Sequence, residues 1–153
     1  MCTALAAALA ACSAGDEPAE APAIVAEIEP ALAALADDAV LYQVAGTPAG
    51  VELVLSDGDQ AVGLTYVGGE LSPATQLGPA SGYTFTPDDV DFDAERILAG
   101  VIDELDDPTL TRFEIVGGGD RPLYSAQVLS DAGGVLQIDL AADGTVLGAA
   151  PLG

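Results

Sequence analysis

Apolar residues near the middle of the chain recur at the spacing of an α-helix. Over residues 93–105 they fall three or four positions apart, and small or polar residues occupy the opposite side of the helical wheel. The apolar set is Ile97, Leu98, Val101, Ile102 and Leu105. Asp93 is a good N-cap, because its carboxylate can accept a hydrogen bond from an unpaired backbone N–H, and Pro108 cannot continue a helix. The pattern predicts an amphipathic helix over 93–105.

After this helix the apolar spacing changes to every second residue. Three runs alternate in this way, and alternation places one face of each strand inward and the other in water. The inward sets are Phe113 and Ile115, then Tyr124, Ala126 and Val128, then Leu136, Ile138 and Leu140. Glycine-rich loops at 117–120 and 131–134 separate the runs and are typical of hairpins. We expect three antiparallel strands with one wet face.

A weaker copy of this arrangement precedes it. Ile24, Ile28, Leu32 and Leu35 have helical spacing, and Pro30 is expected to open the main helix at its first position. Strand-like runs follow at 39–45, 51–56 and 61–67, separated by turn residues. The sequences that end the two helices and the two second strands are also similar, about seventy residues apart.

The pattern therefore predicts an α+β fold made of two tandem repeats. Each repeat is a helix plus a three-stranded antiparallel sheet, with the helices packed on one sheet face. The first αβββ repeat spans 24–71, a linker rich in Pro, Gly, Ser and Thr spans 72–86, and the second repeat spans 87–150. Alternation alone leaves open whether the two repeats share one sheet.

The first 23 residues have a different character. Residues 1–11 resemble the apolar core of a secretory signal peptide, and the run ending at Cys12 resembles a bacterial lipobox. Residues 12–23 are small, acidic and interrupted by proline, as in a disordered tether. We expect Cys12 to be acylated, which makes the protein an extracytoplasmic, membrane-anchored lipoprotein without a disulfide. The alternative is an Ala-rich cytoplasmic helix with incidental cysteines, since no Lys or Arg precedes the apolar run.

Three short motifs resemble those of a known family. They are the run 85–93 before the second helix, the hairpin entry 121–124 and the turn 142–147. With them the chain is similar to bacterial envelope lipoproteins of the PepSY-like class, which relate to the tandem β-lactamase-inhibitor-like fold. The resemblance implies an extracytoplasmic binding or inhibitory module, and it carries over no functional residue.

The charge of the chain narrows the possible functions. There are 25 acidic residues, three arginines, no lysine and no histidine, so the formal net charge is −22. Nucleic acids and anionic membrane surfaces are bound through Lys and Arg, which makes both unsuitable partners. Without histidine or lysine, His-dependent nucleophilic catalysis and Schiff-base chemistry are excluded, and the usual zinc sites lack their ligands. We expect a protein that is not an enzyme and that has no cofactor.

An acidic run before the second helix could in principle bind calcium. Asp88, Asp89, Asp91, Asp93 and Glu95 alternate as in the start of a calcium loop, but the glycine and the closing glutamate of such a loop are missing. Helix capping explains Asp93, and the helix dipole explains Glu95. The capping interpretation is favoured, and we expect no metal site.

The remaining candidates are three tyrosines on inward faces. Tyr42, Tyr66 and Tyr124 suit core packing, and they are also the candidate ligand-binding residues. The function we expect is a lipid-anchored extracytoplasmic binding module that engages an envelope protein or peptide through a wet sheet face or a strand edge. The alternatives are a carrier of an apolar ligand between helix and sheet, and a small hydrolase that uses surface carboxylates. The sequence does not identify the partner, the oligomeric state or the envelope type.

Overall fold

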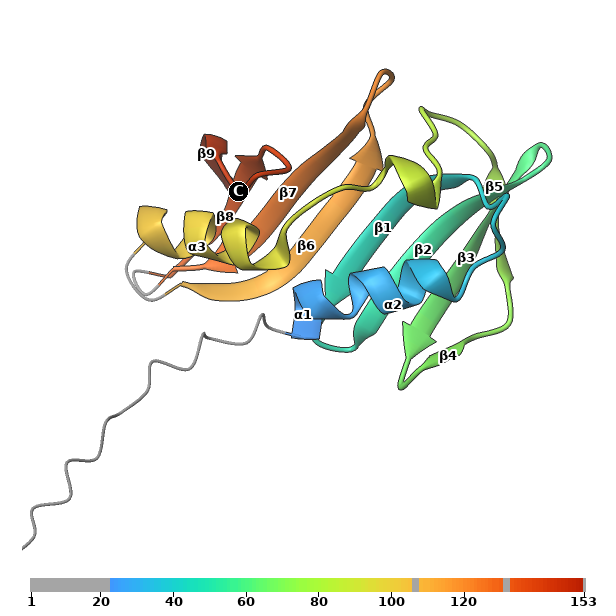
Figure 1. Cartoon of the computed structure of the whole chain (residues 1–153), viewed down its shortest axis with the longest axis horizontal. Coiled ribbons are helices and arrows are strands. Elements are labelled where there is room, and N and C mark those ends of the chain that lie inside the picture. Colours follow the sequence, from blue (N-terminus) through green and yellow to red (C-terminus); the bar gives the residue numbers. More distant parts are fainter. Residues whose placement is uncertain (1–22, 106–107, 131–132, 153) are drawn as a thin grey trace, which may run out of the picture.

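A computed structural model describes residues 23–105, 108–130 and 133–152, and its elements are labelled in Figure 1. The helices are α1 (Ala23–Ala26), α2 (Ile28–Ala33), the 3-10 turn η1 (Pro87–Asp89) and α3 (Ala94–Glu104). The strands of the first half are β1 (Leu41–Thr47), β2 (Gly50–Asp57), β3 (Gln60–Val67), β4 (Glu70–Leu71) and β5 (Thr75–Pro79). Those of the second half are β6 (Thr109–Gly117), β7 (Pro122–Leu129), β8 (Val135–Leu140) and β9 (Val146–Leu152).

The prediction of two separate helix-plus-three-strand repeats is wrong. The described strands form one nine-stranded antiparallel sheet in the order β4-β3-β2-β1-β6-β7-β8-β9, with β5 pairing β3 off this path. The first strands of the two halves, β1 and β6, pair at its centre, where Val44 lies opposite Ile115 and Gly46 opposite Phe113. Two isolated three-stranded sheets would each expose the backbone groups of an edge strand. Pairing β1 with β6 satisfies both edges at once.

Strands also form where none was predicted. The segment 72–86 contains β5, which pairs β3 through a bulge between Ala61 and Val62. Farther along, Phe85 exchanges two backbone hydrogen bonds with Leu41, at 2.8 and 2.9 Å. The C-terminal segment forms the edge strand β9 along β8. The sheet is therefore wider than apolar alternation indicates.

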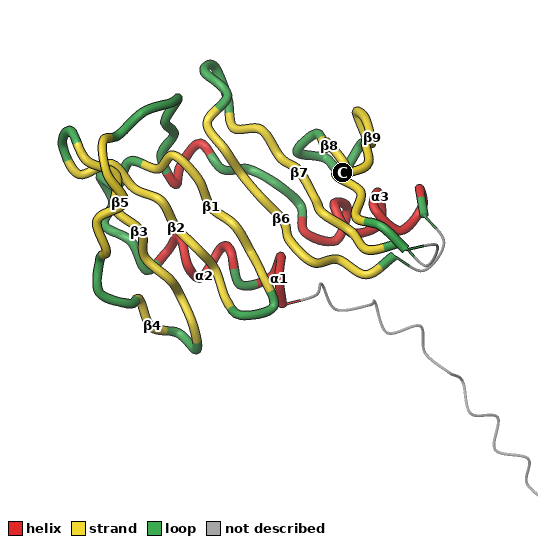
Figure 2. Tube along the Cα trace, turned by 180° about the vertical axis from the view of Figure 1, so that it is seen from behind, coloured by secondary structure: helices red, strands yellow, loops and turns green. Residues whose placement is uncertain are grey.

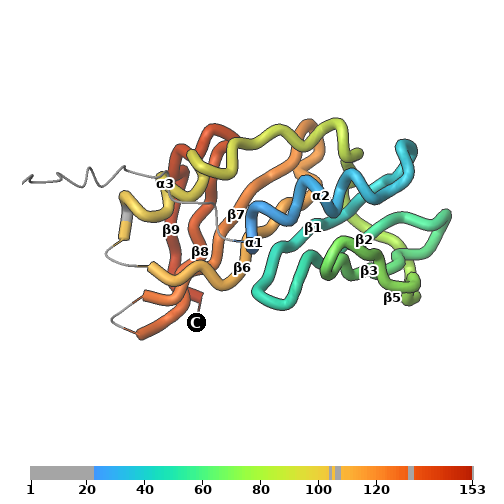
Figure 3. Tube along the Cα trace, turned by 60° about the horizontal axis from the view of Figure 1, so that its bottom comes forward, coloured from blue at the N-terminus to red at the C-terminus, as the bar shows by residue number. Residues whose placement is uncertain are grey.

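All of the described helices lie on one face of the sheet, as Figures 1 and 3 show, and the view from behind in Figure 2 looks onto strands. The core lies between the helices and this face. Its largest fully buried side chains are Phe113, Ile28, Leu41, Leu53, Ile97, Ile115 and Ile138. We call the other side of the sheet the open face, because no described helix covers it.

The helix predicted over 93–105 is confirmed, with small differences at its ends. The carboxylate of Asp93 accepts hydrogen bonds from the backbone N–H groups of Glu95 and Arg96, at 3.0 and 3.1 Å. Ile97, Leu98 and Val101 are buried, whereas Ile102 is 56% exposed. The helix packs against the sheet through the buried side of the predicted apolar stripe.

The first helix is shorter and more broken than predicted. It divides at Glu27 into α1 and α2, and Pro30 is the third residue of α2 instead of its first. Proline lacks an N–H, which costs nothing in a first turn, but its ring crowds the carbonyl four residues before it. That carbonyl belongs to Ala26, the last residue of α1. This crowding explains why the helix is interrupted between Ala26 and Ile28.

Candidate functional site

The open face carries a row of polar side chains across β6, β7 and β8. Register places Glu114 of β6 beside Ala45 of β1 on one side and Ser125 of β7 on the other, and Ser125 beside Asp139 of β8. These residues alternate with the buried Ile115, Tyr124 and Ile138, so they point to the opposite side. An uncovered face of an antiparallel sheet contacts either water or a binding partner. We therefore take this row as the starting point for a candidate site.

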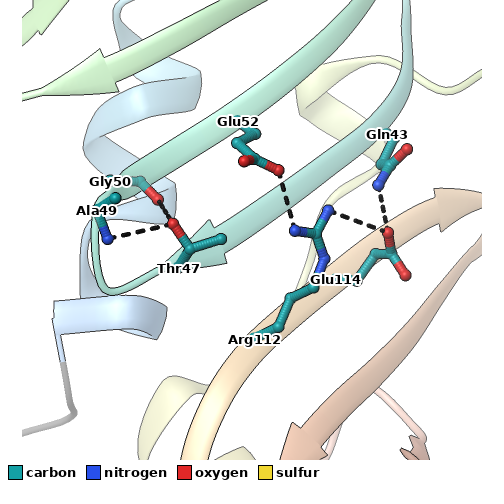
Figure 4. Close-up of polar contacts among 7 residues, drawn as sticks. All are labelled: Gln43, Thr47, Ala49, Gly50, Glu52, Arg112 and Glu114. Carbon is teal, nitrogen blue, oxygen red and sulfur yellow. Dashed lines mark hydrogen bonds and ion pairs between the residues drawn. The ribbon is translucent and has the colours of Figure 1, made fainter. Parts of the chain in front are cut away.

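A charged cluster occupies one end of this row, and Figure 4 shows its contacts. The guanidinium of Arg112 donates to Glu52 Oε2 over 2.9 Å, and its other terminal nitrogen lies 3.6 Å from Glu114 Oε1. The side-chain amide of Gln43 donates to the same oxygen of Glu114. Four residues from β1, β2 and β6 thus form one network, which we call the Arg112 cluster.

The Arg112 cluster carries an excess of negative charge. Two carboxylates surround one guanidinium, and both terminal nitrogens of Arg112 are engaged. The Arg112 and Glu114 side chains are each 24% exposed, whereas Glu52 is 52% exposed. Partial burial fixes the positions of Arg112 and Glu114 better than a fully exposed ion pair would. The cluster therefore presents ordered carboxylates to a molecule approaching the open face.

A hollow of about 400 Å³ adjoins the cluster and shares Glu114 with it. We call it the open-face hollow. It is lined by Glu114, Val116, Leu123, Tyr124, Ser125, Gln137, Asp139, Leu140 and Leu147. Leu123 and Leu147 are 50% and 66% exposed and both border this hollow, so they form a small apolar patch there. On the polar side, the Gln137 amide donates to Asp139 over 3.2 Å.

The hollow extends toward the edge strand β9, where a glycine faces it and leaves space that a side chain would occupy. Gly148 lies opposite Asp139, and a Cβ added to Gly148 would meet no atom within 4 Å. The groups around the hollow are carboxylates, an amide, a hydroxyl and apolar side chains. Such a mixture suits recognition of a polar backbone with an apolar side chain. Among the residues that the structure describes, no group of three or more His, Cys, Asp or Glu could hold a metal ion.

The three predicted tyrosines lie at separate places. Tyr66 is buried beside α1, and its ring helps to line a hollow with Ala23 and Gly68. The Tyr42 hydroxyl donates to Ser56 Oγ over 3.5 Å. Tyr124 borders the open-face hollow and packs against Phe113 on the helix side. The structure does not bring the tyrosines together, and the other predicted site residue, Cys12, lies outside the described residues.

Tyr124 has a specific structural contact that the sequence did not indicate. Its hydroxyl accepts a hydrogen bond from the backbone N–H of Asp91 at 3.3 Å and donates to the carbonyl of the same residue at 3.2 Å. Burial raises the pKa of Tyr124 above its ordinary value, more than the hydrogen bond to Asp91 lowers it. The ring therefore holds the segment before α3 against the sheet.

Two residues of the acidic run before α3, Asp89 and Asp93, make capping hydrogen bonds. Besides Asp93, Asp89 caps η1: its carboxylate accepts from the backbone N–H and the hydroxyl of Thr86, at 2.8 and 2.9 Å. These hydrogen bonds hold the pKa of Asp89 below its usual range. At the turn before β9, a hydrogen bond from the backbone N–H of Thr145 likewise lowers the pKa of Asp143. The interpretation of Asp93 as a cap is confirmed.

Sequence reasoning identified the outward-facing residues of the second half but not the site they form. Alternation placed Arg112, Glu114 and Gln137 on the wet face. It gave no reason to join Arg112 with Glu52, which is sixty residues away. Only the β1–β6 pairing brings these residues together, and no local pattern encodes it.

Comparison with known proteins adds information on the fold. No family model and no curated protein matches the chain, so the PepSY-like resemblance has no support from these comparisons. Among solved structures, the chain is similar to a protein from Clostridium difficile 630 that is described as a putative lipoprotein. The TM-score is 0.57 at 10% identity, over 75% of this chain and 84% of that chain. At this identity the similarity concerns the fold alone.

None of the described helices has both the length and the apolar character needed to cross a bilayer.

Proposed function

We propose that the protein is a lipid-anchored extracytoplasmic binding module that engages a protein or peptide on the open face of its sheet. The observation that supports this most directly is the open-face hollow, where two exposed leucines, Leu123 and Leu147, border ordered polar groups. Apolar side chains exposed beside polar ones are typical of surfaces that a partner covers. The Arg112 cluster next to the hollow adds charged groups that would orient the partner.

Two observations support the lipid anchor and the location that follows from it. The sequence up to Cys12 resembles a lipobox and is followed by a tether-like segment. The protein of similar fold from Clostridium difficile is itself described as a putative lipoprotein. The signal peptide over 1–11 belongs to the same proposal, because a lipid anchor at Cys12 requires secretion across the membrane. The PepSY-like relationship is proposed on the sequence motifs at 85–93, 121–124 and 142–147 alone.

We propose a role in binding and not in catalysis. The sequence contains no histidine and no lysine, which removes the commonest general bases and amine nucleophiles. No observation favours a carrier of an apolar ligand inside the fold. Phe113, Ile97 and the other fully buried side chains pack between the helices and the sheet in the described residues, where such a ligand would have to lie.

The anchor is tested by metabolic labelling with an alkyne fatty acid. We expect the full-length chain to incorporate the label, and Cys12→Ser to abolish incorporation. Cys2→Ser is the matched control, because Cys2 lies within the expected signal peptide and should not affect labelling. Equal labelling of Cys12→Ser and the unaltered chain would refute the anchor.

The binding face is tested by site-specific photo-crosslinking in intact envelopes. A photoreactive residue at Leu147 should capture a defined partner, and the same residue at Ile102 should not. Both positions are exposed apolar residues, but Ile102 belongs to α3 on the opposite side of the sheet. The captured protein is identified by mass spectrometry, and Leu123→Ser should reduce its yield. The same capture from Ile102 as from Leu147 would contradict a site on the open face.

A further inference from the structure

A second hollow surface lies on the helix side of the sheet. The segment from η1 to α3 crosses this face beside α1 and α2, as Figures 1 and 3 show. Two hollows, of about 750 and 570 Å³, lie between that segment and the two helices, and they share Glu29 and Phe92. The two hollows adjoin at these shared residues, and we call them together the helix-side groove.

Part of the groove lining is apolar, and we call this part the wall. Side chains from both flanking segments contribute to it: Val25, Ala26, Leu32, Ala33, Leu35, Ala36, Val90, Phe92, Ala94 and Ala142. Phe92 is held in place by two aromatic neighbours. The centroid of its ring lies 5.5 Å from that of Phe113 and 6.0 Å from that of Tyr124. The Tyr124 hydroxyl also fixes the neighbouring backbone at Asp91. The groove is therefore preformed, so binding there requires little ordering of the protein.

The rim of the groove is almost entirely acidic. Seven carboxylates line it, from Glu29, Asp37, Asp88, Asp91, Asp93, Glu95 and Asp143. The single lining cation, Arg96, is 3.5 Å from Asp93 and offsets that charge. Seven carboxylates and one guanidinium leave a formal charge of −6 around an apolar wall. Such a field attracts cations and repels the polyanions that the composition already excludes.

The dimensions of the groove favour a peptide over a small ion. Its lining on α1 and α2 runs from Val25 to Ala33, which at the helical rise is about 12 Å, and continues past the end of α2 to Asp37. An extended chain needs about four residues to cover the helical part alone. In the described part of the chain no group of three or more ligating side chains could hold a metal ion. A chain segment can instead place cations on the rim and apolar side chains on the wall.

We propose that the helix-side groove binds a basic peptide segment with alternating apolar side chains. Its Lys or Arg residues meet the acidic rim around Glu29, and its apolar residues pack beside Phe92. This site lies on the opposite side of the sheet from the open-face hollow, so it does not depend on the function proposed above. It gives the protein a separate binding site for a cationic segment.

Fluorescence anisotropy with three labelled hexapeptides tests the ligand class. We expect the peptide of alternating lysine and leucine to bind at least about tenfold tighter than the lysine–serine peptide, because only the former reaches the apolar wall. The glutamate–leucine peptide should not bind. Equal affinity for the lysine–leucine and lysine–serine peptides would overturn the proposal, since charge alone would then explain the attraction.

Charge-reversal variants test the location. Glu29→Lys should weaken binding of the lysine–leucine peptide by about tenfold or more, because Glu29 borders both hollows. Glu70→Lys changes the net charge equally at the β4 edge of the sheet and should change the affinity less than about twofold. Equal weakening by the two variants would show nonspecific attraction to an acidic protein and would overturn the proposal.

A third variant tests the shape of the groove without changing its charge. Ala26 is exposed and lines the larger hollow, and leucine is a good helix former. Ala26→Leu should fill part of the groove and weaken peptide binding while leaving the melting temperature unchanged. NMR shift changes on peptide addition should centre on Glu29 and Phe92. Changes centred on Leu147 would instead place the peptide on the open face and would contradict the groove assignment.

Discussion

α3 packs closely on the turn before β9, and Gly100 lies at the contact. A substitution at Gly100 therefore has two opposing effects on the free energy of unfolding, one through helix propensity and one through steric collision. Replacing Gly100 by alanine should stabilise the helix by about 1 kcal/mol, because glycine is a poor helix former. In the folded protein, however, a Cβ at Gly100 would lie 2.0 Å from the carbonyl oxygen of Gly144. That oxygen belongs to the backbone and cannot rotate away, so the helix or the turn must move by more than about 1 Å.

The cost of this movement should exceed the gain in helix propensity. Overpacking a well-packed site costs about 1–3 kcal/mol, and a backbone collision belongs at the upper end of that range. Moving α3 would also disturb Ile97, Leu98 and Val101, which are 0%, 8% and 2% exposed. We therefore expect Gly100→Ala to lower the free energy of unfolding by about 2 kcal/mol net. For a chain of this size that corresponds to a fall of roughly 4–8 °C in melting temperature.

Urea unfolding followed by circular dichroism measures this change. Ala99→Gly is the matched control: Ala99 is exposed on the same helix, so this variant reports helix propensity alone and should cost about 1 kcal/mol. Both variants should therefore destabilise the protein, for different reasons. Ala99→Gly loses helix propensity, whereas Gly100→Ala gains helix propensity but introduces the collision with Gly144. A Gly100→Ala protein as stable as the unaltered chain, or more stable, would refute the contact between α3 and Gly144.

Three further predictions concern the segment before and within α3. Asp93→Ala should cost about 1 kcal/mol through loss of the N-cap, with Asp93→Asn close to neutral, and equal losses for both would contradict capping. The lowered pKa of Asp89 means that its contribution to stability is present above about pH 4 and is lost as pH falls through the folded-state pKa. Asp89→Asn should therefore weaken the protein in urea unfolding at neutral pH, and the loss should shrink as the pH is lowered below about 4; a loss that does not change with pH would argue against this contribution. Tyr124→Phe should cost about 1 kcal/mol through loss of its hydrogen bonds to Asp91. Because burial raises the pKa of Tyr124, the variant should also lose a tyrosine ionisation above the ordinary tyrosine range in a spectrophotometric alkaline titration; an unchanged titration would exclude the assignment.

Local features of the fold could be predicted from the sequence because their causes lie close together in the chain. The helix at 93–105 follows from apolar spacing and from an N-cap within three residues of the groups it satisfies. The inward faces of β6, β7 and β8 follow from strict alternation, which Gly and Asp turns interrupt at the right places. Such signals depend on neighbours along the chain and need no knowledge of the tertiary fold.

The single sheet and the sites on it could not be predicted because they depend on contacts between distant segments. Pairing of β1 with β6 joins residues such as Val44 and Ile115, seventy-one positions apart, and either strand alone has the same alternation whether paired or exposed. β5 lies in a segment whose Gly and Pro content indicates a loop. The Arg112 cluster and the helix-side groove both follow from this long-range arrangement.

The central claim is that the two halves form one sheet with helices on one side only. The most direct test is a set of cross-strand nuclear Overhauser effects between β1 and β6 in the isotope-labelled protein. We predict strong contacts for the facing pairs Val44 with Ile115 and Gly46 with Phe113, together with slow exchange of the amide protons between these strands. If those contacts are absent while the pairs within β1–β3 and β6–β8 are present, the halves are separate sheets and the account is wrong.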